Sequence, residues 1–312
     1  MKNFDEFYAE LQNNNNDELN NAWKEAKKSS EKAKKISLVI CVIIDVFVII
    51  ILLKRDISIA LLIPALIINL FVVAIVNMIF TGKNKYKYNQ IYKQVVVKKI
   101  MNNFYNSLEY FPQKAMPEYI YRQLQYEYYD NYMSEDYMEA QIENNNSIQM
   151  AEVETTETET YTDSKGETQT RTVTKFHGLF AKIIMEKSIN SELKIMQDKA
   201  MMLDKGRLKM DSSEFEKHFD VKASDKIIGM QILTADIMEE LVQFEEKTKM
   251  KFDINIKGNE LYLRFHSGPM FEAGNLKNGV LDEKTTKKYF YMLNFTYNLS
   301  KKLINVISDL NI

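Results

Sequence analysis

The apolar block from Ile36 to Phe80 constrains this chain more than any other feature. Only Lys54-Arg55-Asp56 interrupts it, and the interruption leaves two apolar stretches, 36–53 and 57–80. A helix needs about 20 mostly apolar residues to cross the hydrocarbon core of a bilayer. The sequence therefore predicts a transmembrane hairpin of two helices, with the lipid bilayer as one partner of the chain.

Lysines flank the apolar block on both sides. Lys34 and Lys35 precede it, and Lys83 and Lys85 follow it. An excess of lysine and arginine next to a membrane span marks its cytoplasmic side. We therefore expect a multi-pass protein of a bacterial inner membrane with both termini in the cytoplasm. These lysines would lie at the membrane surface, where anionic headgroups attract them.

Polar side chains occur in both apolar stretches. Asp45 lies near the middle of the first and Asn69 lies in the second. A carboxylate at the centre of a bilayer costs roughly 2.5–3.5 kcal/mol on insertion scales, so Asp45 is expected to have a partner. If the chain turns near residue 55, Asn69 is about one helical turn away. We expect a hydrogen bond between the two helices or between two copies of the chain, and a transport accessory that uses Asp45 is an alternative.

The composition limits the remaining classes. The chain has 312 residues and a formal net charge of −2, which does not favour nucleic acid as a partner. Its one cysteine, Cys41, lies in the first apolar stretch, so the soluble part has no disulfide. The part after the apolar block is long enough for a large domain.

We expect an α+β protein in four parts. A cytoplasmic helical segment (1–35) precedes the transmembrane hairpin (36–80), and a membrane-proximal helix (81–117) follows it. The last part, 118–312, is a cytoplasmic mixed domain with antiparallel β-hairpins and a long C-terminal helix over about 283–310.

Two turn signals predict the β-hairpins. Asp163-Ser-Lys-Gly166 separates two Thr-rich alternating segments, which predicts a β-arm over 148–176. Lys257-Gly-Asn-Glu260 separates two alternating apolar segments, which predicts a second hairpin over 252–265.

Seven tyrosines crowd residues 118–137, among them Tyr126, Tyr128, Tyr129 and Tyr132. Tyrosine combines an apolar ring with a polar tip and suits half-buried surfaces and interfaces. A structural rim of the domain is the expected role of this segment. A docking surface for another protein is the alternative, and the acidic β-arm is a second candidate surface.

The sequence offers little that indicates catalysis. His177, His218 and His266 do not have the spacing of a zinc site. Glu214 and His218 would share a helix face and could hold a metal, but a solvent-facing ion pair is the commoner outcome of this spacing. Neither a glycine-rich phosphate loop nor a nucleophile motif occurs. We therefore expect no cofactor, metal or catalytic residue, and a binding or scaffold protein rather than an enzyme. An enzyme whose site is assembled from distant residues stays an alternative.

The order of five motifs resembles a known family. The motifs are Ser134-Glu-Asp-Tyr, Lys175-Phe-His-Gly-Leu-Phe, the stretch Asp211–Val221, Ile232-Leu-Thr-Ala, and Gly258-Asn-Glu-Leu-Tyr-Leu. This order is similar to the uncharacterised bacterial family known as domain of unknown function 3137. The resemblance implies two membrane spans and a cytoplasmic α+β region. It implies no catalytic residues, so it leaves the activity open.

Overall fold

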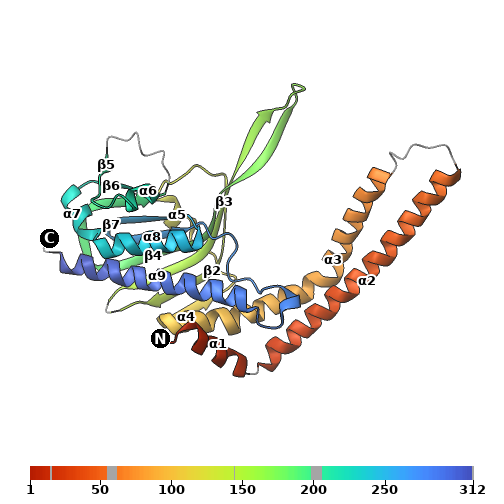
Figure 1. Ribbon diagram of the computed structural model, residues 1–312, viewed down its shortest axis with the longest axis horizontal. Coiled ribbons are helices and arrows are strands. Elements are labelled where there is room, and N and C mark those ends of the chain that lie inside the picture. The colour runs from red at the N-terminus through yellow and green to blue at the C-terminus, as the bar shows by residue number, and fades with distance from the viewer. Residues whose placement is uncertain (15, 55–61, 144, 198–205, 311–312) are drawn as a thin grey trace. The chain divides into compact units, whose positions relative to one another are not determined.

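The computed structural model describes the chain except residues 15, 55–61, 144, 198–205 and 311–312 (Figure 1). Two of the three charged residues expected between the apolar stretches, Arg55 and Asp56, lie outside the described residues. The chain divides into two compact units. The helical unit comprises Lys2–Val97 and Glu272–Lys287, and the sheet unit comprises Lys98–Phe271 and Lys288–Ile312.

The helical unit contains α1 (Phe4–Asn13), α2 (Asp17–Lys54), α3 (Leu62–Tyr92) and the π-helical turn η2 (Lys93–Val97). A capping box starts α1, because the side chain of Asn3 accepts a hydrogen bond from the backbone of Glu6 and Glu6 returns one. α2 packs against α3. The 3₁₀ turn η4 (Leu276–Asn278) is bound to this unit by Trp23, whose Nε1 donates to Leu276 O at 3.2 Å.

The prediction of a two-helix transmembrane hairpin is wrong. Among the described residues, one helix, Ile63–Phe104, is long and apolar enough to cross a membrane. α2 is also a long helix, but its apolar part after Lys35 contains Asp45, whose carboxylate is costly in a bilayer core. One candidate span does not support a multi-pass protein with both termini in the cytoplasm, so that localisation is wrong as well.

The sheet unit confirms the α+β class. It contains a seven-stranded antiparallel sheet with the strand order β1-β2-β3-β4-β6-β5, and β7 also pairs with β4. The strands are β1 (Asn106–Phe111), β2 (Asn131–Gln141), β3 (Ser147–Thr162), β4 (Thr168–Met196), β5 (Arg207–Leu208), β6 (Asp220–Ala223) and β7 (Phe252–Phe265). The helices are α4 (Lys98–Phe104), α5 (Glu118–Arg122), α6 (Phe215–His218), α7 (Lys226–Ile232), α8 (Ala235–Thr248) and α9 (Glu283–Asp309), whose first residues belong to the helical unit.

β7 folds back on itself as a hairpin. Extended chain rises about 3.3 Å per residue, so the ends of a straight strand of this length would be far apart. Instead, His266 N donates to Lys251 O at 2.9 Å, and the rings of Phe252 and Phe265 lie 5.8 Å apart. Gly258 has φ +61° at the tip, a conformation that glycine adopts readily. The hairpin predicted around Gly258 and Asn259 is thus present.

β4 pairs with both halves of this hairpin. Its residues 179–184 pair with 260–265, and its residues 189–195 pair with 254–258. The register shifts between Ile184 and Ile189, where β4 passes the hairpin tip. Residues 179–184 and 189–195 are therefore the two halves of β4, one on each side of the hairpin.

One face of the sheet carries the main hydrophobic core. Phe244 of α8 and Phe295 of α9 stack on each other at 3.6 Å, and both rings contact Phe252 and Phe265 of β7. Alternation along β7 turns its apolar side chains toward these helices. Asp253, Asn255, Tyr262 and Arg264 consequently point to the opposite face.

The β-arm predicted around Asp163–Gly166 is also present, and it projects from the sheet (Figure 1). Asp163 forms its turn by accepting the backbone N–H groups of Lys165 and Glu167, each at 2.9 Å. Gly166 has φ +83° there. Most side chains of the distal arm are exposed.

One local prediction is wrong. Residues 106–111, which lie within the membrane-proximal helix expected over 81–117, form the edge strand β1. Further along the chain, residues 226–232 form α7, which Asp225 caps by accepting two backbone N–H groups.

Candidate functional site

Residues 118–130, here called the cap segment, cover part of the sheet face opposite α8 and α9. They comprise α5 and the loop after it. Tyr121 is the centre of the contact, with its ring stacked on Phe176 at 5.6 Å and edge-on to Phe180 at 5.1 Å. These rings belong to a second cluster of buried side chains, which also includes Ile120, Leu124 and Tyr129. Apolar packing therefore fixes the cap segment on the sheet.

A buried arginine adds a polar anchor. Arg264 Nε donates to Asp253 Oδ2 at 2.8 Å, and its Nη1 donates to Tyr121 Oη at 3.0 Å and to Glu127. The ring of Tyr126 covers the guanidinium at 3.8 Å. Arg264 thus links the hairpin β7 to Tyr121 in α5 and to Glu127 in the loop that follows α5.

The same network shifts the pKa of Asp253. Burial acts to raise this pKa, but a hydrogen bond with His266 and the charge of Arg264 outweigh burial and lower it below its ordinary value. Asp253 is therefore held as a carboxylate. The buried charges satisfy one another, which indicates a supporting role rather than a reactive one.

A pocket of about 520 Å³ lies between the cap segment and the sheet. Its walls come from the cap segment, β4 and β7: Gln123, Leu124, Gln125, Glu192, Lys194, Asn255, Lys257, Asn259, Glu260 and Tyr262. The volume lies within the range of about 300–1,000 Å³ that is typical of small-molecule sites.

Asn255 is the unusual member of this pocket. It is 2% exposed, and its side-chain oxygen has no hydrogen-bond partner among the described residues. A buried polar group without a partner costs about 1–3 kcal/mol. The hydroxyl of Tyr126, beside Arg264, is likewise buried without a partner in the described part of the chain. In the wall of the pocket itself, the side-chain oxygen of Asn255 thus lacks the hydrogen bond that such groups normally make.

The charges around the pocket are balanced. Lys194 pairs with Glu192 at 3.1 Å, and Lys182 pairs with Glu260 at 2.5 Å. Tyr262 donates its hydroxyl to Glu260 at 2.5 Å, and burial raises the pKa of that hydroxyl, which keeps it protonated. The pocket therefore offers hydrogen-bonding groups without a strong excess of either charge.

The tyrosines suggested as a docking surface differ in exposure. Tyr128 is 70% exposed, whereas Tyr129 is 7% exposed and Tyr126 and Tyr132 are half-buried. Tyr132 donates its hydroxyl to Met116 O at 3.0 Å, and burial raises its pKa to about 12. Most of the group faces the cluster beneath the cap segment. A docking role for these tyrosines stays a prediction.

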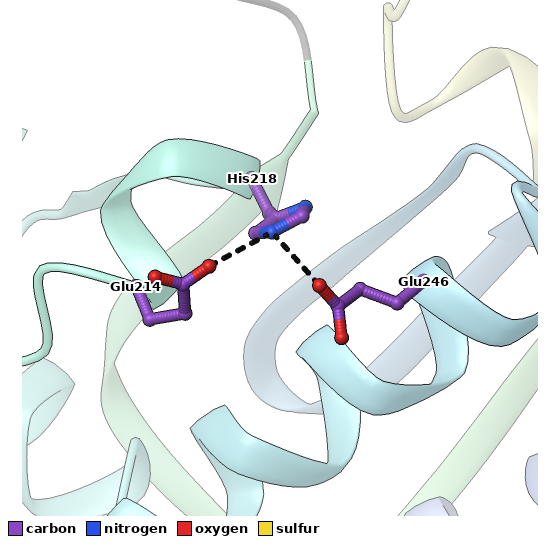
Figure 2. A group of neighbouring side chains, drawn as sticks. All are labelled: Glu214, His218 and Glu246. Atoms are coloured by element: carbon purple, nitrogen blue, oxygen red, sulfur yellow. Dashed lines mark ion pairs between the residues drawn. The ribbon is translucent and has the colours of Figure 1, made fainter.

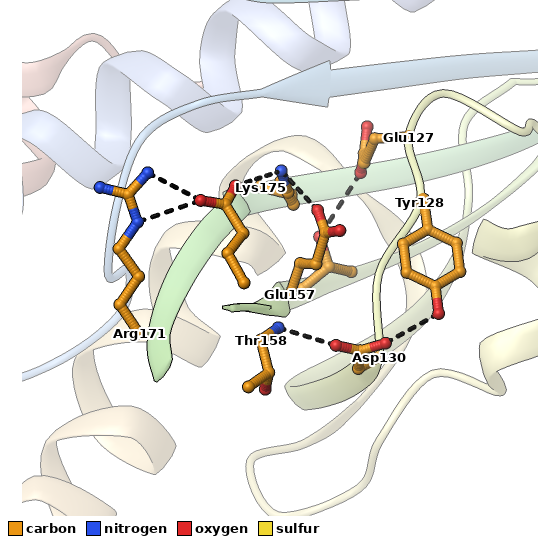
Figure 3. Close-up of polar contacts among 9 residues, drawn as sticks. Glu127, Tyr128, Asp130, Glu157, Thr158, Arg171 and Lys175 are labelled. Atoms are coloured by element: carbon orange, nitrogen blue, oxygen red, sulfur yellow. Dashed lines mark hydrogen bonds and ion pairs between the residues drawn. The ribbon is translucent and has the colours of Figure 1, made fainter. Parts of the chain in front are cut away.

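The cap segment also holds the base of the β-arm (Figure 3). Asp130 Oδ2 accepts the backbone N–H of Thr158 at 2.7 Å, and Asp130 Oδ1 accepts the hydroxyl of Tyr128 at 2.9 Å. Lys175 pairs with Glu157 at 2.6 Å across the two strands of the arm. Asp130 therefore joins the exposed Tyr128 of the cap segment to the base of the arm.

In the helical unit, Asn69 Nδ2 of α3 donates to Asp45 Oδ1 of α2 at 2.7 Å. The two side chains that the sequence analysis paired are thus in contact, and their functional role stays a prediction. Lys34 and Lys35 on α2 and Lys83 and Lys85 on α3 are exposed. Their contact with lipid, a protein partner and self-association of the chain also stay predictions.

His218 and Glu214 lie together at α6, with Nε2 and Oε1 3.6 Å apart. Glu246 of α8 approaches the same imidazole, as Figure 2 shows. The spacing in sequence indicated the first pair. It gave no sign of Glu246, because the two segments are distant in sequence and meet only through the packing of α6 on α8.

The family described as "Protein of unknown function (DUF3137)" has a model that matches residues 174–304. These residues carry an uncharacterised domain of unknown function. The DUF3137 match includes β7 and residues 174–196 of β4. It therefore includes the walls of the pocket that these two strands form. It leaves out the cap segment and the apolar stretches. No curated protein and no solved structure matches the chain.

Proposed function

We propose that the sheet unit is a binding module for a small neutral molecule rich in hydroxyl or amide groups, held between the cap segment and strands β4 and β7. The observation that carries the proposal is the side-chain oxygen of Asn255, which is buried in the wall of the pocket without a partner among the described residues. A ligand that hydrogen-bonds to this group would remove the cost of leaving it unpaired.

The chemistry of the walls supports a neutral ligand. Ion pairs compensate Lys194 and Glu192, so a strongly charged ligand would have to disrupt them. The side-chain oxygen of Asn255 is an acceptor without a described donor, so a ligand hydroxyl or N–H group would satisfy it. Such a site selects a ligand by hydrogen bonds rather than by charge.

The apolar surface of α3 supports a membrane as the setting of this module. Only 11% of the most apolar stretch of the Ile63–Phe104 helix is buried, and Leu66, Leu70 and Phe71 are each at least 64% exposed. An exposed apolar surface of this extent favours burial in lipid or against a partner. Sedimentation of the full chain with membranes, and its release by detergent but not by carbonate at high pH, tests this part.

The binding proposal is tested on the full chain in detergent by hydrogen exchange with mass spectrometry. The wild-type protein and Asn255→Leu are compared with and without a panel of neutral sugars, polyols and blocked dipeptides. We expect at least one compound to slow exchange in residues 118–130 and 252–265 of the wild type and to have no effect on Asn255→Leu.

A matched control is Asn294→Leu, which changes an asparagine on α9 whose side chain bonds Asn298. This variant should respond to the compound as the wild type does. Equal protection of wild type and Asn255→Leu, or no protection by any compound of the panel, contradicts the proposal.

A further inference from the structure

The imidazole of His218 is surrounded by carboxylates from two elements. Glu214 Oε1 lies 3.6 Å and Glu246 Oε1 lies 4.0 Å from Nε2, and Glu245 Oε2 lies 2.9 Å from Nδ1 (Figure 2 shows the first two). Glu214 is the N-cap residue of α6, and His218 is the last residue of α6. Glu245 and Glu246 lie in the last turn of α8.

Apolar packing brings these groups together. Phe215 and Phe219, on either side of His218, are 0% and 2% exposed, and their rings stack at 5.0 Å. Phe219 also contacts Phe252 of β7 at 5.2 Å. The core therefore fixes α6 beside α8 and places the carboxylates near one another despite their mutual repulsion.

The charges at this cluster are not balanced by the described groups. A neutral imidazole carries one proton and can donate to one carboxylate only, whereas both nitrogens of His218 face carboxylates. Glu245 Oε2 is buried and lies 2.9 Å from His218 Nδ1. It nevertheless lacks the geometry of a hydrogen bond with any described group. Lys217 pairs with the other oxygen of Glu214, so Oε1 still faces His218.

We propose that His218, Glu214 and Glu246 bind a divalent transition metal ion of the zinc class. This site is separate from the pocket under the cap segment and does not depend on the function proposed for it. Nε2 and the two Oε1 atoms would be the ligands, and Glu245 at Nδ1 would orient the imidazole. A carboxylate at the second nitrogen of a ligand histidine is a common feature of metal sites.

The distances agree with this assignment. Ligand atoms each about 2.1 Å from one tetrahedral ion lie about 3.4 Å apart. The three candidate ligand atoms already lie within 4.8 Å of one another, so small side-chain movements complete the site. The imidazole favours zinc and its neighbours over calcium and magnesium, which prefer oxygen ligands alone.

A pocket of about 280 Å³ lies next to the cluster, and His218 is in its wall together with Arg207 and Asp220. Arg207 is engaged by Asp220, with Nε and Oδ1 2.9 Å apart, so it does not compete for the glutamates. The pocket gives solvent or a small ligand access to the ion.

The test uses the full chain freed of metal with a chelator and then titrated with Zn²⁺ alone. Isothermal titration calorimetry and metal analysis after dialysis measure affinity and stoichiometry. We expect one Zn²⁺ per chain in the wild type, no binding to His218→Ala, and about tenfold or greater weakening in Glu246→Gln. Glu246 is 53% exposed at its side chain, so this second variant should keep the fold.

Glu239→Gln is the matched control, because it removes one carboxylate from α8 at a residue that bonds Gln243 instead of the cluster. It should bind Zn²⁺ as the wild type does. The proposal is overturned if the wild type binds no Zn²⁺, if folded His218→Ala keeps the ion, or if Glu239→Gln weakens binding as much as Glu246→Gln does. Equal binding of Ca²⁺ and Zn²⁺ would overturn the assignment to the zinc class.

Discussion

Arg264 and Asp253 face each other across the two halves of the β7 hairpin, with Nη2 and Oδ2 2.7 Å apart. Both side chains are at least 92% buried, because the cap segment covers them. The ion pair therefore joins three segments, since Arg264 also bonds Tyr121 and Glu127. The guanidinium of Arg264 therefore adds a polar anchor to the apolar packing that holds the cap segment.

Replacing Arg264 with methionine should destabilise the protein by about 3–5 kcal/mol, because it leaves Asp253 and Glu127 without their buried partner. Chemical denaturation followed by far-UV circular dichroism measures the loss. Arg122→Met is the control, since Arg122 pairs with Glu118 on the exposed side of α5. A similar midpoint for Arg264→Met and Arg122→Met would contradict the anchoring role.

The lowered pKa of Asp253 predicts a dependence of stability on pH. A carboxyl group whose pKa is lower in the folded state stabilises the protein fully above its unfolded pKa of about 3.9. That contribution is lost as the pH falls through the folded pKa. Asp253→Asn should therefore be less stable than the wild type at pH 7, and the difference should shrink below about pH 4. Thermal unfolding from pH 7 to pH 3 checks this, and a constant difference across that range would argue against it.

Asn255→Leu should raise the free energy of unfolding by about 1 kcal/mol when no ligand is present, because it removes a buried polar group without a partner. For a unit of this size the melting temperature should rise by about 2–4 °C. Differential scanning calorimetry measures the change. A lower melting temperature would mean that Asn255 stabilises the ligand-free protein, and the argument for a ligand in the pocket would then fail.

Glycine-to-alanine substitutions should have opposite effects at two positions. A Cβ at Gly178 would lie 1.9 Å from Phe265 O and 2.7 Å from Ser267 N, so Gly178→Ala should cost at least about 3 kcal/mol by forcing β4 away from β7. A Cβ at Gly82 on α3 meets no atom within 4 Å, and Gly82→Ala should stabilise that helix by about 1 kcal/mol. Chemical denaturation of the wild type and both variants tests this. The unfolding midpoint should fall for Gly178→Ala and rise for Gly82→Ala.

Asp130→Ala should loosen the β-arm without unfolding the sheet. The substitution removes the acceptor of the Thr158 N–H, so the amides at the base of the arm should exchange faster with solvent. Hydrogen exchange of the peptide around Thr158, compared with the peptide around Ile183 in the sheet, measures the effect. Unchanged exchange at Thr158 would show that the strand pairing alone holds the arm.

The elements that sequence reasoning located have strong local signals. Gly258 and Gly166 have positive φ at hairpin turns, and the helical spacing of Phe290, Leu293 and Tyr297 marks α9. The edge strand β1 was missed because its apolar residues continue the helical spacing of the preceding segment. Residues 36–53 were counted as a span on their apolar length, with a partner expected to offset the cost of Asp45, whereas among the described residues only the Ile63–Phe104 helix is long and apolar enough to cross a membrane.

The sites were harder to foresee. The motif Lys175-Phe-His-Gly-Leu-Phe now has a packing explanation, since Phe176 and Phe180 support the cap segment and Gly178 lets β7 approach. Glu214 and His218 were visible as a pair because helix periodicity is local. Glu246, and the unpartnered state of Asn255, depend on contacts between distant segments, which a single sequence does not display.

The β7 hairpin lies between the two halves of β4, so the middle of the sheet is the last part of it to be synthesised. A ribosome-bound chain that ends before residue 252 has no strand to join 179–184 to 189–195. Until then, the side of the sheet with β1, β2 and β3 and the side with β5 and β6 are separate fragments with open inner edges. Such edges invite pairing between nascent chains, and the sheet can close only after residues 252–265 have been synthesised.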